Sequence, residues 1–383
     1  MTSSSANTDS QEGGAGAPLR AVLDRFALGG TLVGIEPLRR GHIHDTFLST
    51  WEDKSAGSGA GSERGDQQRR FIHQRLNSQV FPDLDLLMRN ISVVTEHIHH
   101  QVIAAESEGF EPLQLVPTRA GQPYLQSDHG NWRTYVFIER SESHDRCEGP
   151  EQAHEAARAF GWFQRQLLGL DSSELGETLP RFFSSPFRLE QFEAALAKAP
   201  EPLRLTASMA IEFALERREM VSVIDRDLRS GAIPRRIVHG DTKLNNILFD
   251  RDTGRARGIV DLDTCMPGYS LYDFGDLVRF TAATSAEDER DATLIGTDLA
   301  LYSALSEGYL SMASSFLRPR EIELMPFAAR LVTFTIGLRF LADFLDGDRY
   351  FKTDRPEQNL DRARAQFGMV DFMERNRDAM AAS

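Results

Sequence analysis

The sequence is poor in cysteine, and this scarcity excludes two classes of protein. Its 383 residues contain two cysteines, Cys147 and Cys265, which lie far apart and outside any CxxC spacing. A fold held together by disulfides and a cysteine-based zinc site are therefore both unexpected. Free cysteines of this kind are typical of a reducing compartment, so we expect the protein to be cytoplasmic.

A basic excess is also missing. The chain carries 43 Lys and Arg residues against 57 Asp and Glu residues, which gives a formal net charge of −14. Such a charge opposes non-specific attraction to nucleic acid phosphates or to anionic lipid. Neither nucleic acid nor a membrane is therefore predicted as a partner. The acidity could attract a cationic small substrate, although an acidic balance also serves solubility.

Long apolar runs are absent as well. No stretch reaches the roughly 18 uninterrupted apolar residues of a membrane span, and the first residues lack the pattern of a secretory signal. Residues 1–18 and 52–69 are rich in Ser, Gly and charged residues. We expect a disordered tail and a flexible insertion there. The rest of the chain, with 41% hydrophobic residues overall, can bury a large core.

Periodicity divides the remaining chain into two regions. After a short helix at 19–26, alternating β-type runs at 31–38, 46–51 and 70–76 precede a helix at 83–102. Further β-type runs follow at 113–118, 123–126 and 132–139. Helical periodicity then dominates, over 151–168, 187–198, 207–225, 291–312, 319–345 and 359–376. This pattern predicts an α+β protein with an N-terminal lobe at 19–140 and a mainly helical C-terminal lobe at 141–383.

In the second lobe, the stretch 237–280 departs from the helical pattern. A short apolar segment ends in His239-Gly240-Asp241, and Asn246 lies five residues after Asp241. A second predicted strand is followed by Asp261 and Asp263 and then by a predicted Pro-Gly turn. A hairpin would place these polar ends on one side. Asp241 could then accept the proton of a substrate hydroxyl, while Asn246 and Asp261 could share a Mg²⁺ ion that bridges phosphate oxygens. The spacing therefore predicts phosphoryl transfer.

Weaker signals surround this stretch. Gly41, between the first two strands, could let a loop cradle phosphates, although a single glycine is also an ordinary turn residue. Arg75 could pair with nucleotide phosphates or be a surface group. Asp263 lies two residues beyond Asp261 on the expected strand and shares its face, so it could assist the metal or substrate, or cap the next turn. Asp273 is expected to brace the Asn246 loop.

At these residues the sequence resembles a known superfamily. The run HGDTKLNN (239–246) with IVD (259–261) is similar to the catalytic loop and metal strand of aminoglycoside phosphotransferases and choline kinases, which are small-molecule relatives of protein kinases. The resemblance, from about residue 19 onward, implies a two-lobed protein-kinase-like fold that uses ATP and Mg²⁺, with Asp241 as catalytic base and Asn246 and Asp261 as metal ligands. It implies cofactor-binding roles for Gly41, His42, Thr46, Arg75, Phe137 and Glu139.

A narrower resemblance suggests the acceptor. The segments FIHQRLN, VFPDLDLLMRNI, DLDTCMPGYSLYDFGDLVRF and GLRFLADFL are similar to those of N-acetylhexosamine 1-kinases. This implies transfer of the ATP γ-phosphoryl group to the anomeric hydroxyl of an N-acetylated sugar, by a protein that we expect to be a monomer. Arg339 and Tyr350 become substrate-side candidates beside Asp263, although Arg339 could equally form a structural ion pair.

The chain also departs from that narrower pattern. His44 replaces a usual Asn, Arg89 stands where a helix Glu is expected, and Phe183-Ser184-Ser185 replaces a His-Asp-Thr phrase. The acceptor therefore stays open. An amine-bearing acceptor, such as an aminoglycoside or a choline-like alcohol, is one alternative, and a regulatory pseudokinase that binds ATP is another.

Overall fold

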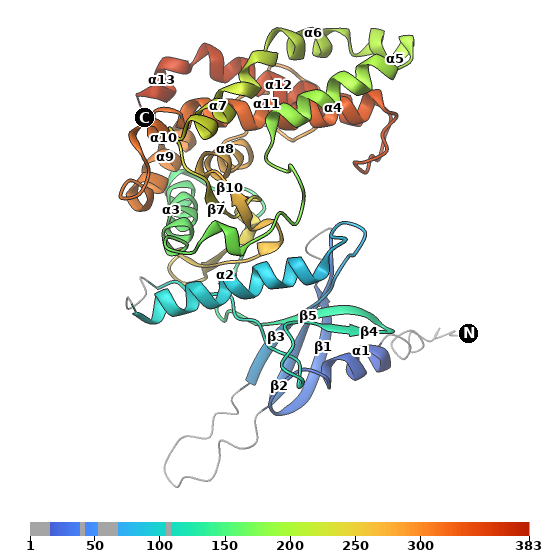
Figure 1. Cartoon of the computed structure of the whole chain (residues 1–383), viewed down its shortest axis with the longest axis vertical. Coiled ribbons are helices and arrows are strands. Elements are labelled where there is room, and N and C mark those ends of the chain that lie inside the picture. Colours follow the sequence, from blue (N-terminus) through green and yellow to red (C-terminus); the bar gives the residue numbers. More distant parts are fainter. Residues whose placement is uncertain (1–15, 39–42, 53–67, 105–108, 383) are drawn as a thin grey trace, which may run out of the picture. The chain divides into compact units, whose positions relative to one another are not determined.

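The structure is a computed structural model that describes residues 16–38, 43–52, 68–104 and 109–382 (Figure 1). The chain folds as two units, each with its own interior. Unit 1 contains residues 1–99 and 112–139, and unit 2 contains residues 100–111 and 140–383. The tail through residue 15, residues 53–67 of the expected insertion, and the candidates Gly41 and His42 lie outside the described residues.

The described strands of unit 1 form a five-stranded antiparallel sheet in the order β1-β2-β3-β5-β4. The predicted strand at 113–118 is wrong, because this segment makes only isolated bridges, through Leu115 to Tyr135 and through Thr118 to Phe26. Pro117 has no N–H group and so interrupts a continuous ladder. The strands are β1 (Thr31–Leu38), β2 (Asp45–Glu52), β3 (Gln68–Arg75), β4 (Leu125–Ser127) and β5 (Gly130–Val136).

A short helix and one face of this sheet enclose the core of unit 1. Helix α1 (Gly16–Leu23) contributes Leu19, Val22 and Leu23, which are buried with Trp51 and Phe71. Helix α2 (Leu84–Ala104) begins in the same unit, and Tyr124 donates a hydrogen bond to the carboxylate of Asp85 in its first turn. Further side chains in the α1 core are Phe26, Leu28, Val116, Leu125 and Trp132.

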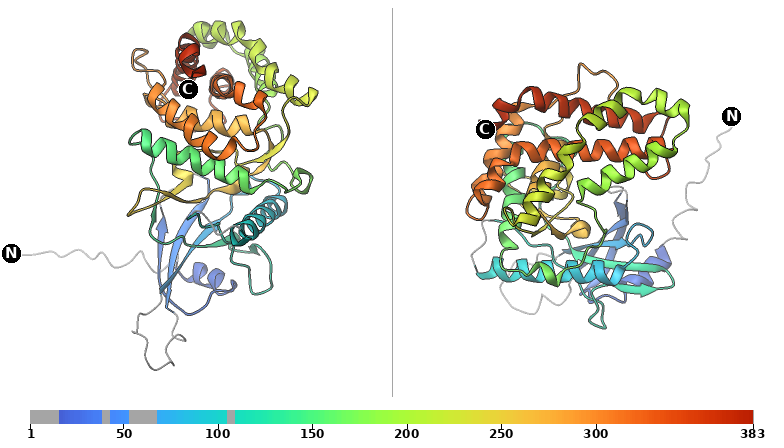
Figure 2. Two further views of the ribbon diagram at one scale, coloured as in Figure 1. Left: turned by 90° about the vertical axis from the view of Figure 1, so that its left-hand side faces the viewer. Right: turned by 45° about the horizontal axis from the view of Figure 1, so that its top comes forward.

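Unit 2 is mainly helical and is built around α11 (Met325–Leu345). This helix packs against α4 (Ser185–Lys198), α8 (Ser270–Thr281) and α12 (Gln358–Arg375), while α3 (Pro150–Gln166) packs against α9 (Leu299–Ala313) (Figures 1 and 2). The other helices are α5 (Glu201–Thr206), α6 (Ser208–Glu216), α7 (Ser222–Ser230), α10 (Pro319–Glu323) and α13 (Arg377–Ala381).

Within the described residues, α11 is also the one helix long and apolar enough to cross a membrane. Its most apolar window is 78% buried inside the protein. A helix that is apolar on all sides is expected at the centre of a large helical unit. The length and composition of α11 are therefore those of a core helix.

Three predicted helices of unit 2 are shorter than expected. The helix at 207–225 is interrupted by a 3₁₀ turn at Arg218–Val221, and the one at 319–345 is divided at Leu324. Helix α9 begins at Leu299 rather than near residue 291, because the Asp298 side chain accepts hydrogen bonds from the N–H groups of Ala300 and Leu301 and so caps the helix there. Apolar periodicity continues across such breaks and does not reveal them.

Short strands complete unit 2 and flank the loops that contain Asp241, Asn246 and Asp261. Strand β7 (Arg236–Val238) pairs with β10 (Met266–Gly268), and β8 (Ile247–Asp250) pairs with both β6 (Ser141–Glu142) and β9 (Ala256–Ile259). The predicted Pro-Gly turn is therefore wrong, because Pro267 and Gly268 lie in β10. A two-stranded ribbon tolerates proline, since each strand has one edge outside the ladder. The α+β class, with an N-terminal antiparallel sheet and a helical C-terminal region, is confirmed.

The β8–β9 turn is held by Asp250. Its Oδ1 atom accepts hydrogen bonds from the N–H and hydroxyl groups of Thr253, both at 3.0 Å, and its Oδ2 atom lies 2.8 Å from Nη1 of Arg257. The Thr253 hydrogen bonds, together with Arg257, lower the pKa of Asp250 to about 2. The ionised carboxylate is therefore favoured in the folded turn.

We expect Asp250→Asn to lower the melting temperature by an amount that depends on pH. A carboxyl whose pKa is lower when folded stabilises the protein above its unfolded pKa of about 3.9, and this contribution is lost as the pH falls toward 2. The difference in melting temperature between wild type and variant should be constant from pH 5 to 8 and shrink below about pH 4. Asp252→Asn, in the same turn but 67% exposed, is the control. A gap for Asp250→Asn that is unchanged at pH 3 would contradict this assignment.

Candidate active site

The loop between β7 and β8 places a carboxylate beside an ammonium group. Nζ of Lys243 lies 2.8 Å from Oδ1 and 3.0 Å from Oδ2 of Asp241. Burial has the largest single effect and disfavours the ammonium, but the charge and hydrogen bond of Asp241, together with the charge of Asp276, raise the pKa of Lys243. A permanent positive charge therefore lies at this carboxylate at neutral pH. Sequence reasoning missed Lys243, whose position two residues after Asp241 in a loop was the available signal.

Asn246 completes this arrangement from the end of the loop. Its Nδ2 atom donates to the backbone oxygen of Asp241 at 2.8 Å and to Oδ2 of the same residue at 3.3 Å. The amide is thereby oriented, and its Oδ1 atom accepts no hydrogen bond from the part of the chain that the structure describes. Asn246 thus combines a donor toward Asp241 with a carbonyl oxygen that suits a hard cation.

Asp261 lies beside Asn246 because Asn246 directly precedes β8, Asp261 follows β9, and these two strands pair antiparallel. The Val260 N–H group donates to the Asn246 backbone oxygen at 3.0 Å. Asp261 itself has φ 63° and ψ 60°, a left-handed conformation that costs free energy for a residue other than glycine. The chain then enters a 3₁₀ turn at Leu262–Thr264. A strained aspartate at a strand end is a frequent property of functional sites.

The structure corrects the prediction that Asp261 and Asp263 project from one strand face. Strand β9 ends at Ile259, and the left-handed turn at Asp261 removes the alternation of side chains on which that prediction depended. Asp263 is 2% exposed, and its backbone oxygen accepts a hydrogen bond from Thr178 at 3.1 Å. Its position follows from the turn and not from a strand.

Asn246 and Asp261 together fit a magnesium site that is completed by a substrate. Mg²⁺ in phosphoryl-transfer enzymes is usually bound by one or two protein oxygens together with phosphates and water. Among the residues that the structure describes, no group of three or more His, Cys, Asp and Glu side chains could hold a metal ion. A metal site formed by Asn246 and Asp261 would therefore need further ligands from outside the protein. When bound, the ion would neutralise charge on phosphate oxygens.

His239 and Gly240 set the path of the loop. His239 accepts the Asp241 N–H group at Nδ1, and its Nε2 atom lies 3.0 Å from the Val260 backbone oxygen. Gly240 has φ 82°, and a Cβ atom there would lie 2.7 Å from the Phe183 ring and 2.8 Å from the Thr264 backbone oxygen. Only glycine fits this turn without displacing its neighbours. The loop is thus tied both to the end of β9 and to Phe183.

Asp273, on α8, holds the same loop in place through hydrogen bonds. Its carboxylate accepts the N–H group of His239 at 2.9 Å, the N–H group of Gly240 at 2.8 Å and the amide of Gln164 at 2.7 Å. Burial raises the pKa of Asp273, and His239 and the two backbone donors oppose that rise. Its backbone oxygen also accepts the Thr242 hydroxyl. The predicted brace is therefore present, at the start of the loop.

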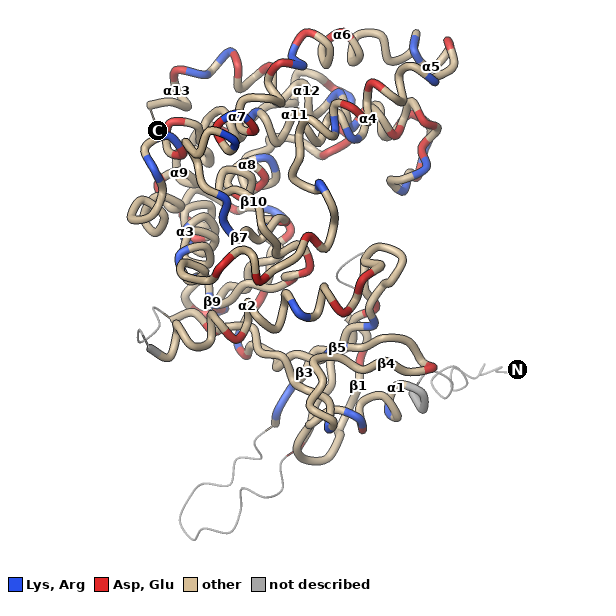
Figure 3. Tube along the Cα trace, viewed as in Figure 1, with Lys and Arg blue, Asp and Glu red and all other residues tan. Residues whose placement is uncertain are grey.

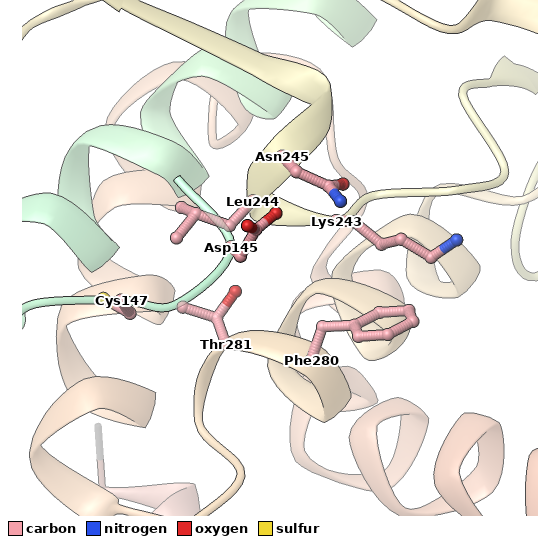
Figure 4. Close-up of a pocket in the computed structure, with 7 residues that line it drawn as sticks. All are labelled: Asp145, Cys147, Lys243, Leu244, Asn245, Phe280 and Thr281. Atoms are coloured by element: carbon pink, nitrogen blue, oxygen red, sulfur yellow. The ribbon is translucent and has the colours of Figure 1, made fainter. Parts of the chain in front are cut away.

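A cavity of about 130 Å³ lies against the loop (Figure 4). In Figure 4 the Lys243 side chain extends above the Phe280 ring, and Nζ lies 5.2 Å from the ring centroid. The volume is below the roughly 300 Å³ of a typical small-molecule site, so the cavity alone cannot enclose a nucleotide or a sugar. It is lined by Asp145, Cys147, Lys243, Leu244, Asn245, Phe280 and Thr281.

The predicted phosphate-side residues that the structure describes lie in unit 1. Thr46 on β2 accepts a hydrogen bond from the Gln74 amide at 3.3 Å. Arg75 ends β3, is 54% exposed and lies 3.7 Å from the Asp45 carboxylate. This separation and exposure describe a weak ion pair, which leaves the guanidinium able to exchange Asp45 for another anion.

The predicted adenine hinge follows β5. The Phe137 N–H group donates to the Arg70 backbone oxygen at 3.0 Å, and the Arg70 guanidinium lies 4.1 Å from the Phe137 ring centroid. The same guanidinium pairs with Glu139. Arg70 therefore positions both predicted hinge residues, a role that alternation in β3 could not reveal.

Two of the departures from the narrower sequence pattern also lie in unit 1. Nδ1 of His44 accepts the Asn77 N–H group at 3.1 Å, and the His44 ring lies 6.1 Å from that of Phe81. Arg89 is exposed on α2. His44 therefore has a structural role at the end of the sheet.

Comparisons with known proteins agree with this architecture. A model of the family described as "Phosphotransferase enzyme family" matches residues 108–313, more than half of the chain. An aminoglycoside phosphotransferase from Alicyclobacillus acidocaldarius has a similar structure, with a TM-score of 0.58, 15% identity and coverage of 95% of this chain and 94% of that one.

Two further solved structures are similar. A microcompartment-associated aminopropanol kinase matches with a TM-score of 0.54 and 14% identity over 95% of this chain and 98% of its own. A spectinomycin phosphotransferase in complex with ADP and spectinomycin matches with a TM-score of 0.50 and 10% identity over 91% of this chain and 94% of its own. At these identities the similarity shows the fold, and the predicted kinase-like fold is confirmed.

Proposed function

Since this chain belongs to the phosphotransferase enzyme family, we propose that it transfers the γ-phosphoryl group of ATP to a hydroxyl group of a small sugar, with Mg²⁺ as cofactor. The observation that carries the proposal is the Asp241 carboxylate, held by the Lys243 ammonium and the Asn246 amide beside Asp261. Enzymes that transfer phosphoryl groups act mainly by positioning and by neutralising charge, which these groups can supply.

In this proposal each residue has a separate task. Asp241 accepts the proton of the acceptor hydroxyl. At the same time, the oxygen of that hydroxyl forms a bond to the γ-phosphorus, and the bond between the γ-phosphorus and the departing ADP oxygen breaks. The Lys243 ammonium offsets negative charge on the transferred group. Asn246 and Asp261 would hold the metal. The nucleotide would be bound by unit 1 residues, namely Gly41, His42, Thr46 and Arg75 at the phosphates and Phe137 and Glu139 near the adenine.

The proposed acceptor site is the anomeric hydroxyl of an N-acetylhexosamine, with Asp263, Arg339 and Tyr350 as acceptor-side groups. Long sequence segments similar to those of N-acetylhexosamine 1-kinases support this choice. Arg339 lies on α11, with its guanidinium carbon 5.9 Å from the ring centroid of the 73% exposed Tyr350. We further propose that the protein is cytoplasmic and acts as a monomer.

An amine-bearing acceptor is the second candidate. The names of two similar structures, an aminoglycoside phosphotransferase and an aminopropanol kinase, favour it, as does the net charge of −14. A cation beside Arg339 would be repelled, however, which makes a sugar the better choice. A pseudokinase is the weakest alternative, because Asp241, Asn246 and Asp261 are all present.

A direct test is ADP release from ATP in the presence of N-acetylhexosamines, hexoses, aminoglycosides or choline. We expect the sugars to stimulate ADP release above the rate of ATP hydrolysis in water, and EDTA to abolish this stimulation. Stimulation by aminoglycosides or choline alone would show that the acceptor is an amine-bearing compound and not a sugar. Binding of ATP without ADP release for any hydroxyl compound would support the pseudokinase.

A further inference from the structure

Arg339 has an unusual environment for a half-buried arginine. Its guanidinium carbon lies 5.6 Å from the Phe182 ring centroid, 5.4 Å from that of Phe351 and 5.9 Å from that of Tyr350. Within the described ranges it forms no hydrogen bond or ion pair with the protein. Aromatic faces stabilise a guanidinium but leave its N–H donors unused. Arg339 therefore has donors available for a ligand.

A second arginine shares the same ring. Arg188, in the first turn of α4, has its guanidinium carbon 6.0 Å from the Phe182 centroid. Its Nη atoms donate to Gln191 and to the Phe182 backbone oxygen, whereas its buried Nε atom has no partner. Burial and then the charge of Arg339 lower the pKa of Arg188 to about 10. Two like charges thus lie close together, without a carboxylate paired to either among the described residues.

The loop that carries Tyr350 is fixed in place. The Asp343 carboxylate accepts the backbone N–H groups of Arg349, Tyr350 and Phe351, at 2.8–3.0 Å, and the amide of Asn359 at 2.9 Å. Asp343 is buried, one helical turn beyond Arg339 on α11, and its oxygens are occupied by these donors. The nearest acidic side chain along the helix therefore organises the aromatic loop and does not neutralise Arg339.

The arginine pair is connected to the Asp241 loop through two aromatic rings. The Phe182 ring, which both arginines approach, lies 5.2 Å from the Phe183 ring, and Phe183 fills the space beside Gly240. Helices α4 and α11, which carry Arg188 and Arg339, pack side by side (Figures 1 and 2). The two arginines are therefore separated from the turn at Gly240, directly before Asp241, by the Phe182 and Phe183 rings.

We propose that Arg188 and Arg339 bind an anionic group of the acceptor, either a carboxylate or a phosphate, so that the substrate is an acidic sugar derivative. This inference rests on the proposed function and specifies its acceptor class. Two guanidinium groups without an anion are costly when half-buried, and carboxylates and phosphates match the geometry of their donors. A neutral sugar would leave that charge uncompensated.

The arginine pair differs in charge from the chain as a whole. Acidic and basic residues are interspersed along the helices of unit 2 (Figure 3), and the net charge is −14. An acidic protein repels anions at long range. A pair of arginines without acidic partners is therefore a local exception, which suits recognition of a specific anion at short range.

Matched acceptor pairs test the inference. Glucose is compared with glucuronate, and N-acetylglucosamine with its 6-phosphate, by ADP release and by titration calorimetry on the full chain. We expect the acidic member of at least one pair to bind about 10- to 100-fold more tightly than the neutral member, and the two pairs distinguish carboxylate from phosphate. Added NaCl should weaken binding of the acidic member only.

Substitutions of the two arginines test whether they cause the preference for the acidic sugar. Arg339→Gln and Arg188→Gln should each weaken binding of the acidic sugar much more than binding of the neutral sugar, which removes most of the preference. Arg229→Gln, which breaks an exposed ion pair with Asp225 on α7, should leave the preference unchanged. Equal binding of neutral and acidic sugars, or equal loss for both in the arginine variants, would overturn the inference but leave the kinase proposal standing. If no sugar releases ADP but the acidic sugar binds through the arginines, the inference stands and the proposed function fails.

Discussion

Asp241→Asn is expected to lower kcat by about 10²- to 10⁴-fold with little change in ATP affinity, because an amide cannot accept the proton of the acceptor hydroxyl. The substitution keeps the shape of the side chain. The Asn246 hydrogen bond to the backbone oxygen of residue 241 is also kept. A structural defect should therefore be small, and the loss should fall on the chemical step.

The measurement is single-turnover phosphoryl transfer together with nucleotide binding by calorimetry. Asp371→Asn, which removes a carboxylate from a surface ion pair on α12, serves as the control and should retain wild-type activity. A kcat for Asp241→Asn within tenfold of wild type would show that Asp241 is not the proton acceptor. A large loss of ATP affinity would indicate a role in nucleotide binding instead.

The second large effect is expected for Asp273→Ala. This change leaves three donors in the interior without an acceptor, namely the N–H groups of His239 and Gly240 and the amide of Gln164. Each buried donor left unsatisfied costs about 1–3 kcal/mol, so we expect the free energy of unfolding to fall by about 3–5 kcal/mol. Phosphoryl transfer should fall as well, because the loop that presents Asp241 loses its anchor.

The control for Asp273→Ala is the removal of a carboxylate that is exposed rather than buried. Asp298→Ala also removes a carboxylate that accepts two backbone N–H groups, but this carboxylate is an exposed helix cap. Water can satisfy those donors, so the expected cost is about 1 kcal/mol. Urea denaturation followed by circular dichroism compares the two variants. Equal costs would mean that the Asp273 network contributes no more than an ordinary cap.

Local spacing explains why much of the Asp241 region was predictable. The β8–β9 hairpin follows from two apolar segments joined by a turn, and it brings Asn246 next to Asp261 whatever surrounds it. The α+β division likewise follows from the change in apolar periodicity near residue 140. These features depend on residues close together in the chain.

The other features depend on packing that periodicity does not encode. The left-handed turn at Asp261 cannot be inferred from an apolar run that reads as a continuing strand. The bonds from Asp273 to Gln164 and Gly240 join residues 109 and 33 positions apart. The relation of Arg188 to Arg339 depends on the packing of α4 against α11, which periodicity does not encode.

The buried bonds of Asp273 also have a consequence for how the loop moves. Gln164 on α3 donates to Asp273 on α8 and accepts the Tyr309 hydroxyl of α9 at 2.8 Å, so the backbone amides of His239 and Gly240 are connected to three core helices. Local opening of a segment costs little only when it can separate from its surroundings. These two amides should therefore exchange hydrogen with solvent as slowly as the helical core, which makes the turn before Asp241 part of the cooperative folding unit.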